Sequence, residues 1–525
     1  MSAVGSSNDA HGLISKRLSK ELVIALSGPV GAGLPIVREQ LEKALKERQY
    51  TPVHVKLSDL FAQQMSKLNL KPEEAIPGTA AFERIWKLQG MGNQLRGAMG
   101  EDMAAQLAVK QIAVHRASEH PAVGLNEIEP LRVAYIVDQL KHPREVRLLR
   151  AIYDDLFYMV GVLSAHDRRK AFLKDLGMST PEAEKLIDRD RKEAGSDGQQ
   201  LEKTLLHADY FINNSKKNLP SILGSLQRFL ALVHGDPRVS PDAEERGMYA
   251  AYSAGLRSAC LSRQVGAAIA DEAGNVISTG CNDVPKGGGG LYEPGPGDQR
   301  CIHKGGLCYN DKHKEKLGLE IADVLHKEGF KQEQIVKITA AIRENTRVGA
   351  LIEFSRAVHA EMDAIVGVAR TGAKGIVGST LYTTVYPCHN CARHIVAAGI
   401  ASVVFIEPYE KSLAADLHDD AILQELEPKP EYKNYSLVHF RHFEGVSPVK
   451  FARLFQMGAA RKNRHGKAVD QDVAGEKKES MYLDDYKVLE TRVIQNLDLV
   501  ERKLAPPPPP ASPSPLPLPP SPAAG

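Results

Sequence analysis

Apolar residues along this chain fall into two patterns, short unbroken blocks and longer stretches in which they recur every three or four positions. The short blocks predict buried β-strands, and the periodic stretches predict helices. Residues 19–230 alternate the two patterns, as an α/β domain does. Residues 21–27 (ELVIALS) form the first strand-like block, and Leu41 and Leu45 lie on one face of the helix expected after it. This part of the chain is therefore predicted to have an α/β fold.

A second helix–strand–helix succession lies in the C-terminal half. Residues 357–369 (AVHAEMDAIVGVA) combine helix formers with apolar periodicity and predict a helix that ends before Gly372. Residues 380–386 (TLYTTVY) are mostly β-branched or aromatic and predict a strand that Pro387 ends. A second helix is expected from Cys391 onward. Two helix starts therefore flank one strand.

Changes in composition mark the boundaries between these regions. Residues 234–247 (HGDPRVSPDAEERG) combine glycine, proline and charge, as a linker between domains does. The last 21 residues hold 11 of the 31 prolines, which predicts an extended, unpacked tail. We expect a disordered segment at 1–18, a first domain at 19–233, a linker at 234–245, a second domain at 246–470, a helix at 471–504 and the proline-rich tail at 505–525.

Apolar residues before the proline-rich tail recur at spacings of four and three. This spacing predicts an amphipathic helix, used either for packing or for contact between subunits of a homo-oligomer. The residues are Tyr482, Tyr486, Leu489, Val493, Leu497 and Val500.

The overall composition excludes several classes of protein. The net charge is +2 at pH 7, and no apolar run approaches the roughly 20 residues that cross a membrane. The first twelve residues lack the charged and apolar regions of a secretion signal. Six cysteines among 525 residues fit a reducing cytosol better than a disulfide scaffold. We therefore expect a cytoplasmic protein without a membrane partner.

One cluster of residues has the composition of a catalytic zinc site. His359, Cys388 and Cys391 would supply one imidazole and two thiolates, leaving the fourth tetrahedral position for a water whose pKa zinc lowers to about 7. Thiolates at a helix start are stabilised by its positive end. Glu361, beside the metal but not bound to it, is then placed to move protons. The alternative is a redox or structural Cys-x-x-Cys pair, with His359 as an ordinary packed histidine.

The spacing H-x-E…P-C-x-x-C is the signature of zinc nucleobase deaminases. With residues 262–267 (SRQVGA) and 279–285 (TGCNDVP), it makes residues 246–455 resemble the deoxycytidylate deaminase branch of the cytidine deaminase family. The resemblance implies a mixed central sheet flanked by helices, with zinc between two helix starts. It also implies that Asn282 holds the sugar and that the backbone N–H of Ala360 meets the pyrimidine carbonyl. Asn282 could instead be a turn residue that bonds its own backbone.

The first domain carries a glycine loop between its first strand and the following helix. Gly28, Gly31 and Gly33 lie where a P-loop cradles phosphate with backbone N–H groups. Leu34 and Pro35 stand where a P-loop has lysine and serine or threonine, so phosphotransfer is not expected. Nucleotide sensing through the remaining loop and a purely structural or oligomerising domain are both open. A likeness to nucleoside monophosphate kinases extends to residues 132–138, 186–190 and 208–214.

A second group of metal-ligating residue types lies in a glycine-rich segment. Cys301, His303, Cys308 and His313 fall within 13 residues and would suit a second, structural zinc. Their spacing matches no standard zinc finger, and clustered polar residues of a loop are the commoner explanation.

A basic stretch lies downstream of the predicted zinc site. An anionic nucleotide needs cations, and Lys450 or Arg453 could reach its phosphates. A solvated basic face is the more frequent reason for such a stretch.

A kinase-like first domain joined to a deoxycytidylate deaminase domain resembles bacterial antiphage deoxycytidine nucleotide deaminases. The resemblance implies hydrolytic deamination of dCMP or dCTP in defence, a homo-oligomer and an inhibitory RNA or protein. Alternatives are a housekeeping dCMP deaminase and a deaminase of RNA or single-stranded DNA. The latter would need stacking aromatics and a basic channel, whereas aromatics make up 6% here with one tryptophan. A regulatory nucleotide-binding protein is a further class, but binding alone would not need Glu361.

Overall fold

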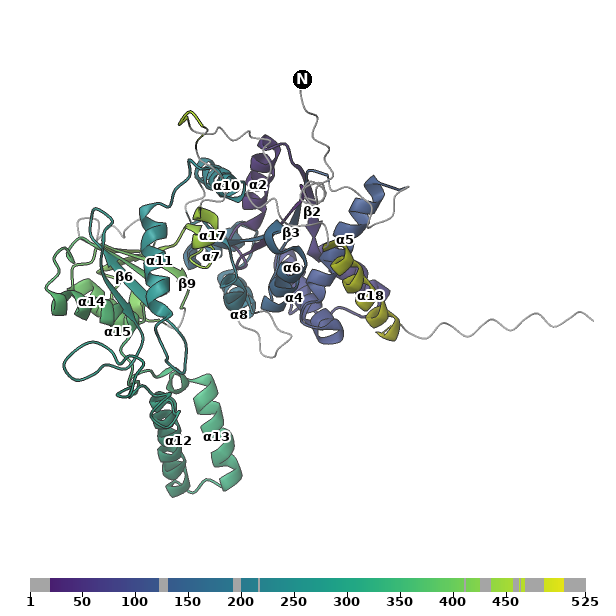
Figure 1. Cartoon of the computed structure of the whole chain (residues 1–525). Helices are drawn as coiled ribbons and strands as arrows, with labels where there is room; N and C mark the ends of the chain where they lie inside the picture. The colour runs from purple at the N-terminus through teal and green to yellow at the C-terminus, as the bar shows by residue number, and fades with distance from the viewer. Residues whose placement is uncertain are drawn as a thin grey trace, which may run out of the picture.

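The computed structural model describes residues 19–121, 131–191, 200–215, 218–409, 412–424, 436–456, 462, 464–467 and 486–504. The predicted N-terminal segment and proline-rich tail lie outside these residues. Within the described part, two six-stranded sheets each carry helices (Figure 1), so the predicted α/β class is confirmed. Every helix in this part is too short or too polar to reach across a lipid bilayer.

Five parallel strands form the body of the first sheet. They are β1 (Leu22–Ser27), β2 (Thr51–Lys56), β3 (Val133–Asp138), β4 (Phe157–Leu163) and β5 (Tyr210–Asn213). Their order across the sheet is β5-β4-β1-β3-β2. Every residue of β1 and β4 is buried, because helices cover both faces of a parallel sheet and leave little need for polar side chains.

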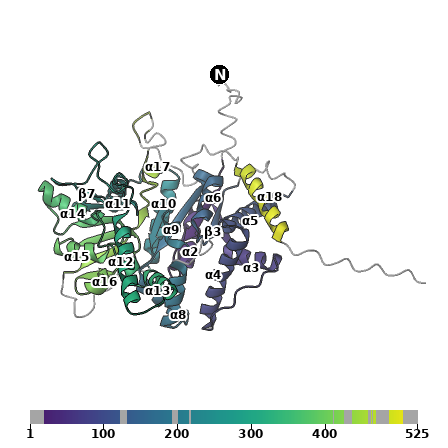
Figure 2. The ribbon, with the colours of Figure 1, turned by 90° about the horizontal axis from the view of Figure 1, so that it is seen from below.

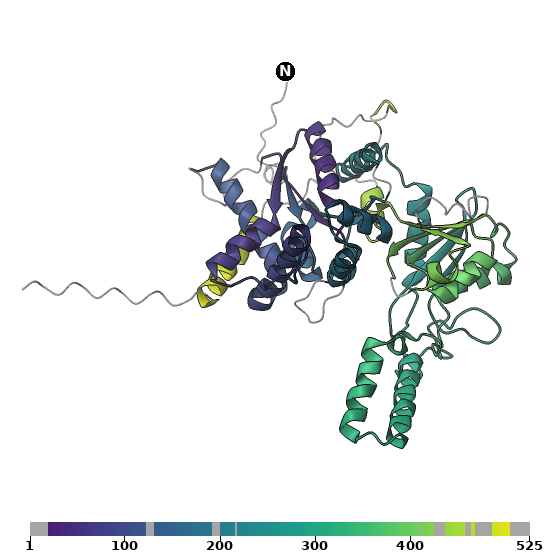
Figure 3. The ribbon, with the colours of Figure 1, turned by 180° about the vertical axis from the view of Figure 1, so that it is seen from behind.

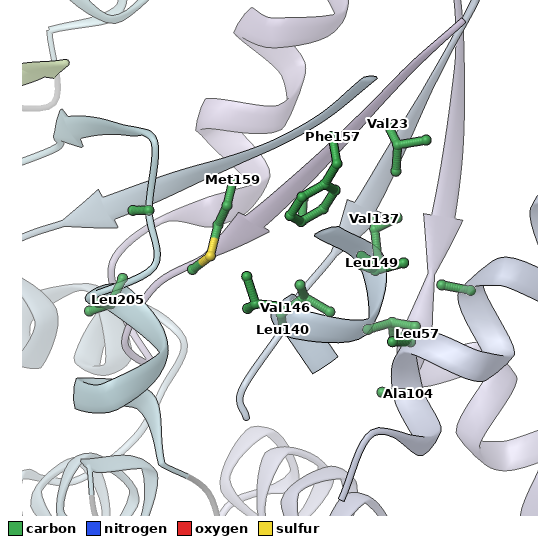
Figure 4. Close-up of a cluster of buried hydrophobic side chains, with 14 of the residues drawn as sticks. Val23, Leu57, Ala104, Val137, Leu140, Val146, Leu149, Phe157, Met159 and Leu205 are labelled. Carbon is green, nitrogen blue, oxygen red and sulfur yellow. The ribbon is translucent and has the colours of Figure 1, made fainter. Parts of the chain in front are cut away.

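Helices surround this first sheet. They are α2 (Leu34–Glu47), α3 (Leu57–Lys67), α4 (Ala80–Met99), α5 (Met103–Glu119), α6 (Pro143–Tyr153), α7 (His166–Asp175), α8 (Thr180–Arg191), α9 (Leu201–Leu205) and α10 (Leu219–Val233), with a 3₁₀ turn η1 (Asp154–Leu156). In Figure 4, Val23, Val137 and Phe157 of the sheet lie beside Val146 and Leu149 of α6. All five side chains are buried, so this layer is part of the domain's core.

The second sheet is mixed, as predicted. Its strands are β6 (Gly266–Ala270), β7 (Val276–Cys281), β8 (Thr380–Val385), β9 (Ser402–Glu407), β10 (Ile422–Gln424) and β11 (Val438–His442). Their order is β10-β11-β9-β8-β6-β7. β6 runs antiparallel to both of its neighbours, and the strands from β8 to β10 are parallel.

Helices lie on both faces of the second sheet. They are α11 (Ala243–Gly255), α14 (Ala360–Thr371), α15 (His389–Ala397) and α16 (Ala414–Leu417). Successive side chains of a strand point to opposite faces of its sheet, so alternate residues of β6 contact the helices on opposite faces. Ala267 and Ile269 share a core cluster with α14 and α15, whereas Ala268 and Ala270 share one with α11. The α11 face is continuous with the core of the first domain.

A helical hairpin interrupts the second domain and was not anticipated from the sequence. It consists of α12 (Tyr309–Lys327) and α13 (Gln332–Asn345), followed by a 3₁₀ turn η2 (Arg347–Ala350). Figures 1 and 3 show it projecting from the body of the molecule. α12 has no buried residue and α13 buries Ile335, so the two helices pack mainly against each other.

The chain returns to the first domain earlier than the predicted boundary at residue 470. β12 (Gly445–Val446) pairs antiparallel with β5 and becomes the sixth strand of the first sheet. The following helix α17 (Phe451–Phe455) packs on α10. Phe451 stacks on Tyr249 of α11, with ring centroids 4.2 Å apart and planes at 10°. Glu245 of α11, which is buried, binds Arg228 of α10 at 2.7 Å and accepts the Val446 N–H at 2.9 Å.

The C-terminal helix α18 (Tyr486–Leu504) packs on α5 of the first domain, far from α14 and α15 (Figure 2). The predicted start of this helix, with Tyr482, lies outside the described residues. Tyr486 and Leu497 are buried, as the amphipathic pattern predicts. Arg116 of α5 joins the two ends of the described chain, since it binds Glu21 at 2.9 Å and Glu490 at 2.7 Å.

Candidate active site

Two helix starts bring the predicted metal ligands together. His359 caps α14 and Cys388 caps α15, both with extended backbone, and Cys391 lies in the first turn of α15. His359 Nδ1 lies 3.3 Å from Cys388 Sγ and 3.4 Å from Cys391 Sγ. The ligand atoms of these three side chains all lie within 4.8 Å of one another. In the described part of the chain, no other set of three or more metal-ligating side chains converges in this way.

The geometry of this trio fits a zinc ion. Zn–S and Zn–N bonds of about 2.3 and 2.0 Å at tetrahedral angles place the ligand atoms ~3.5 Å apart. The observed separations of 3.3 and 3.4 Å are close to that value. Both cysteines are buried and His359 is half-buried. A catalytic zinc site has this composition, three protein ligands and one open position.

Proton sharing within the trio favours a thiolate. Hydrogen bonding with Cys391 and His359 lowers the pKa of the Cys388 thiol, and the bond to Cys388 raises the pKa of His359 to about 9. The same sharing with Cys388, together with burial, raises the pKa of Cys391. Binding of zinc to both sulfurs therefore requires release of a proton.

Glu361 is the second residue of α14, and 4% of its surface is exposed. Burial raises the pKa of its carboxyl, and the neighbouring His359 opposes that rise. A buried carboxyl with a raised pKa is suited to take up and return a proton near neutral pH. Glu361 lines the same cavity as His359 and Cys388 and is not part of the converging trio, and its role as proton carrier stays a prediction.

β7 packs closely on the first turn of α14 and holds it in place, a contact that the sequence alone does not reveal. A Cβ at Gly280 would lie 2.2 Å from the carbonyl oxygen of Ala360 and 2.4 Å from the Ala364 nitrogen. The next residue, Cys281, donates its N–H to Asp363 at 3.1 Å. The strand therefore touches the first turn of the helix directly, which is the turn that carries Glu361.

A cavity of about 190 Å³ opens onto this cluster. His359, Ala360, Glu361, Cys388 and Asn282 all line it. A larger hollow of about 540 Å³ reaches His359 from the side of α14 and α15, but its lining does not include Glu361 or Asn282. The smaller cavity is therefore the candidate substrate site.

Asn282 faces the cavity and also braces its wall. Its Nδ2 donates to the Arg263 carbonyl at 2.8 Å, and its Oδ1 accepts the Val265 N–H at 2.7 Å. These partners lie 19 and 17 residues away in the sequence, so the side chain holds a distant segment and the turn interpretation does not account for its bonds. Contact with a sugar remains a prediction.

Several lining residues were not assigned a role from the sequence. Arg263 lies within the SRQVGA motif and binds Glu407 at 2.6 Å, and it is the cation among the described lining residues. Tyr386 packs edge-on against Phe405 and accepts a hydrogen bond from Gln424 at 2.6 Å. Among these residues, Arg263 could have been suspected from the sequence, because it lies within the SRQVGA motif. The other lining residues include Cys260, Ser262, Asn310, Ile352, Ser355 and Tyr409.

The second group of metal-ligating types does not converge into a ligand set in the described structure. Cys301 and Cys308 line a small cavity of about 30 Å³, but His303 and His313 do not line it. His303 lies 3.3 Å from Asp298, and His313 stacks on Phe354. A second zinc at these residues stays a prediction without geometric support.

Lys450 and Arg453 lie at the junction between the domains rather than at the cavity. Lys450 is 3.8 Å from Asp209, and Arg453 pairs with Asp155. Neither residue lines the cavities described above. Their predicted contact with substrate phosphates is therefore not supported.

Gly28, Gly31 and Gly33 form the loop between β1 and α2 that the sequence predicts. Gly31 and Gly33 have φ of +84° and +78°, a conformation that favours glycine. The loop belongs to the first domain and does not line the candidate substrate site.

Comparison with known proteins agrees with this site. The family profile described as "Cytidine and deoxycytidylate deaminase zinc-binding region" matches residues 241–407. The deoxycytidylate deaminase of Enterobacteria phage T2 is 32% identical over 162 residues, covering 31% of this chain and 78% of that protein. The phage T4 enzyme is 31% identical and is covered to 76%. The dCMP deaminase of cyanophage S-TIM5, solved with dCMP and dUMP, aligns at 18% identity over 39% of this chain and 100% of its own, with a TM-score of 0.23.

The two phage relatives each match 31% of this chain. Residues 241–407, which the family profile matches, contain His359, Glu361, Cys388 and Cys391. On this evidence, the chain belongs to the cytidine and deoxycytidylate deaminase family.

Proposed function

We propose that this protein is a zinc-dependent hydrolase that converts dCMP or dCTP to the corresponding deoxyuridine nucleotide and ammonia. The observation that carries the proposal is the buried Glu361 carboxyl next to His359, Cys388 and Cys391 at the base of one cavity. The names of the phage T2 and T4 relatives support a deoxycytidylate substrate.

The residues of the cavity account for the chemistry of deamination. His359, Cys388 and Cys391 would hold a zinc ion, which when bound would lower the pKa of a water to about 7 and make it a nucleophile for C4 of cytosine. Glu361 would take one proton of that water and hand it to the pyrimidine ring. It would then take the second proton from the hydroxyl now on C4 and pass it to the amine, which leaves as ammonia. The N–H of Ala360, at the start of α14, is proposed to bind the pyrimidine carbonyl. The burial of Glu361 keeps this proton transfer away from bulk water.

Arg263 is proposed to bind the phosphate of the substrate. It is the cation among the described residues of the cavity wall, and 42% of its side chain is exposed. Its present partner, Glu407, would have to share the guanidinium or release it. A guanidinium presents several N–H donors to a phosphate, which makes it a strong ligand for that group.

Nucleotide turnover tests the substrate and the role of Arg263 together. We expect the purified protein to convert dCMP, dCTP or both, with products resolved by mass spectrometry. Arg263→Gln should raise KM for the nucleotide about 10- to 100-fold, since a hydrogen bond to a charged group contributes roughly 1.5–3 kcal/mol. The residual activity on deoxycytidine, which has no phosphate, should change little. Equal losses on both substrates would mean that Arg263 only shapes the cavity, and no conversion of any nucleotide would refute the proposed function.

The first domain is proposed to restrain the deaminase until phage infection, when dCTP depletion would block phage replication. Support comes from the way the two domains interlock through β12 and through the Arg228–Glu245 pair. Arg441 of β11 adds a 2.7 Å ion pair with Glu244 of α11. A movement in the first sheet would therefore be transmitted to α11, which packs on β6 and β8 of the deaminase sheet. An RNA or protein inhibitor is proposed as the ligand that the infection removes.

The defence role predicts that protection from phage requires catalysis. Cells that express the native protein should survive phage challenge and lose deoxycytidine nucleotides, whereas cells that express Glu361→Ala should do neither. Plaque counts and nucleotide pools from the same cultures measure both effects. Equal protection by the two proteins, or an unchanged pool, would leave a housekeeping role in pyrimidine metabolism as the better account.

A further inference from the structure

The glycine loop of the first domain is held by side chains from three other segments. Lys141, which follows β3, donates to the Gly28 carbonyl at 2.8 Å. Arg169 of α7 donates to the Val30 carbonyl at 3.0 Å. Asn214, after β5, donates to the Ala32 carbonyl at 2.8 Å. The carbonyl groups of the loop thus already have partners within the chain.

A carboxylate also accepts a backbone N–H group of the same loop. Asp190, near the end of α8, accepts the backbone N–H of Val30 at 2.6 Å. Its other oxygen lies 2.7 Å from the ammonium of Lys141. Asp190 is 1% exposed and Lys141 is 12% exposed, so this ion pair is almost shielded from water. An anion therefore contacts both a loop amide and a lysine.

These contacts reproduce what a P-loop offers to a phosphate. Such a loop presents backbone N–H groups and one lysine to the anion. The sequence has Leu34 where that lysine is expected, but Lys141 brings an ammonium to the loop from another segment. Burial lowers the pKa of Lys141, and the charge of Asp190 is the main influence against that effect. The pair is thus mutually dependent, since either charge alone would be buried without compensation.

Packing around the loop reinforces its closure. A Cβ at Gly31 would lie 2.7 Å from the backbone oxygen of Arg169, so α7 rests directly on the loop. α7 and α8 also pack on each other. For the Asp190 carboxylate to leave the loop, either α8 would therefore have to shift or the Asp190 side chain would have to turn away.

From these observations we propose that Asp190 is a built-in substitute for a phosphate group and keeps the glycine loop closed without a nucleotide. The loop of the native protein then does not bind phosphate, because its anion position is taken. A phosphate group can enter only when Asp190 leaves or loses its charge. This inference does not depend on the deaminase activity, which uses a different cavity.

Thermal unfolding of the full-length protein with inorganic phosphate tests this proposal. Asp190→Ala should show a saturable rise in Tm with phosphate, because the vacated amide and Lys141 then accept the anion. The native protein should show only the small, unsaturable rise that phosphate causes by exclusion from protein surfaces. Asp188→Asn removes an exposed carboxylate two residues away on the same helix and should behave like the native protein. Phosphate that bound at the deaminase cavity would affect all three proteins equally.

Two further variants make the outcome decisive. Asp190→Asn keeps the shape of the side chain and should also gain the phosphate response, or regain its fold when phosphate is added. Asp190→Ala combined with Lys141→Ala should lose the response, because the cation is gone. ATP in a parallel titration shows whether a nucleotide enters as inorganic phosphate does. A saturable response of the native protein equal to that of Asp190→Ala would overturn the proposal, as would two Asp190 variants that neither bind phosphate nor are stabilised by it.

Discussion

Glu361→Gln should lower kcat by about a thousandfold or more while the protein keeps its fold and its zinc. Proton transfer by a positioned side chain contributes roughly 10²- to 10⁴-fold to a rate, and here one residue serves several transfers. Glutamine has nearly the same shape as glutamate but cannot take up the proton. Because Glu361 lies outside the trio of ligands, its loss leaves the metal site complete.

Ammonia release under saturating nucleotide gives kcat, and elemental analysis gives zinc per chain. Glu353→Gln is a matched control, since it makes the same change at an exposed carboxylate that does not line the substrate cavity. That control should retain native turnover. Near-native kcat in Glu361→Gln would remove Glu361 from the mechanism, and loss of zinc from it would show that the carboxylate supports the metal instead.

Cys388→Ala should abolish activity for a different reason, the loss of the metal itself. In the described part of the chain three side chains converge as a candidate ligand set, and His359 Nδ1 lies 3.3 Å from the Cys388 sulfur that would be removed. Two remaining ligands hold zinc far more weakly than three, so zinc should fall from about one per chain to near zero. The two substitutions are thus distinguished by metal content even though both stop turnover.

Cys281→Ala provides the control for Cys388→Ala. Cys281 is also a buried thiol and lies beside α14, but burial raises its pKa to about 11 and keeps it protonated. It is not among the three converging ligands. The Cys281→Ala protein should therefore keep its zinc and its activity. Full zinc content in Cys388→Ala would contradict the ligand assignment.

The sequence alone was sufficient for the metal site because its parts are local. His359 and Glu361 are two residues apart at one helix start, and Cys388 and Cys391 are three apart at another. Helix periodicity and the strand between them predict where each helix begins. Once both helices flank neighbouring strands, their first turns meet. The glycine loop was recognised for the same reason, since a strand, three glycines and a helix follow one another directly.

Contacts between distant segments could not be read from the sequence. β12 has two residues and joins the first sheet only because the edge of β5 is free to pair with it. Lys450 and Arg453 looked like phosphate ligands, but Asp209 and Asp155 of the first domain bind them instead. A basic side chain has the same appearance in a sequence whether its partner is a substrate or a carboxylate.

Local patterns are therefore what the sequence by itself determined: the trio of converging metal-ligating side chains, the deaminase family of the second domain, the α/β class and the missing lysine of the glycine loop. The tertiary structure alone decided which charges meet. Asp190 reaches a loop 160 residues away, and Arg116 joins Glu21 to Glu490. Buried charges are tolerated only where an opposite charge is held within hydrogen-bonding distance. That distance is set by packing of whole helices and sheets, which no short stretch of sequence encodes.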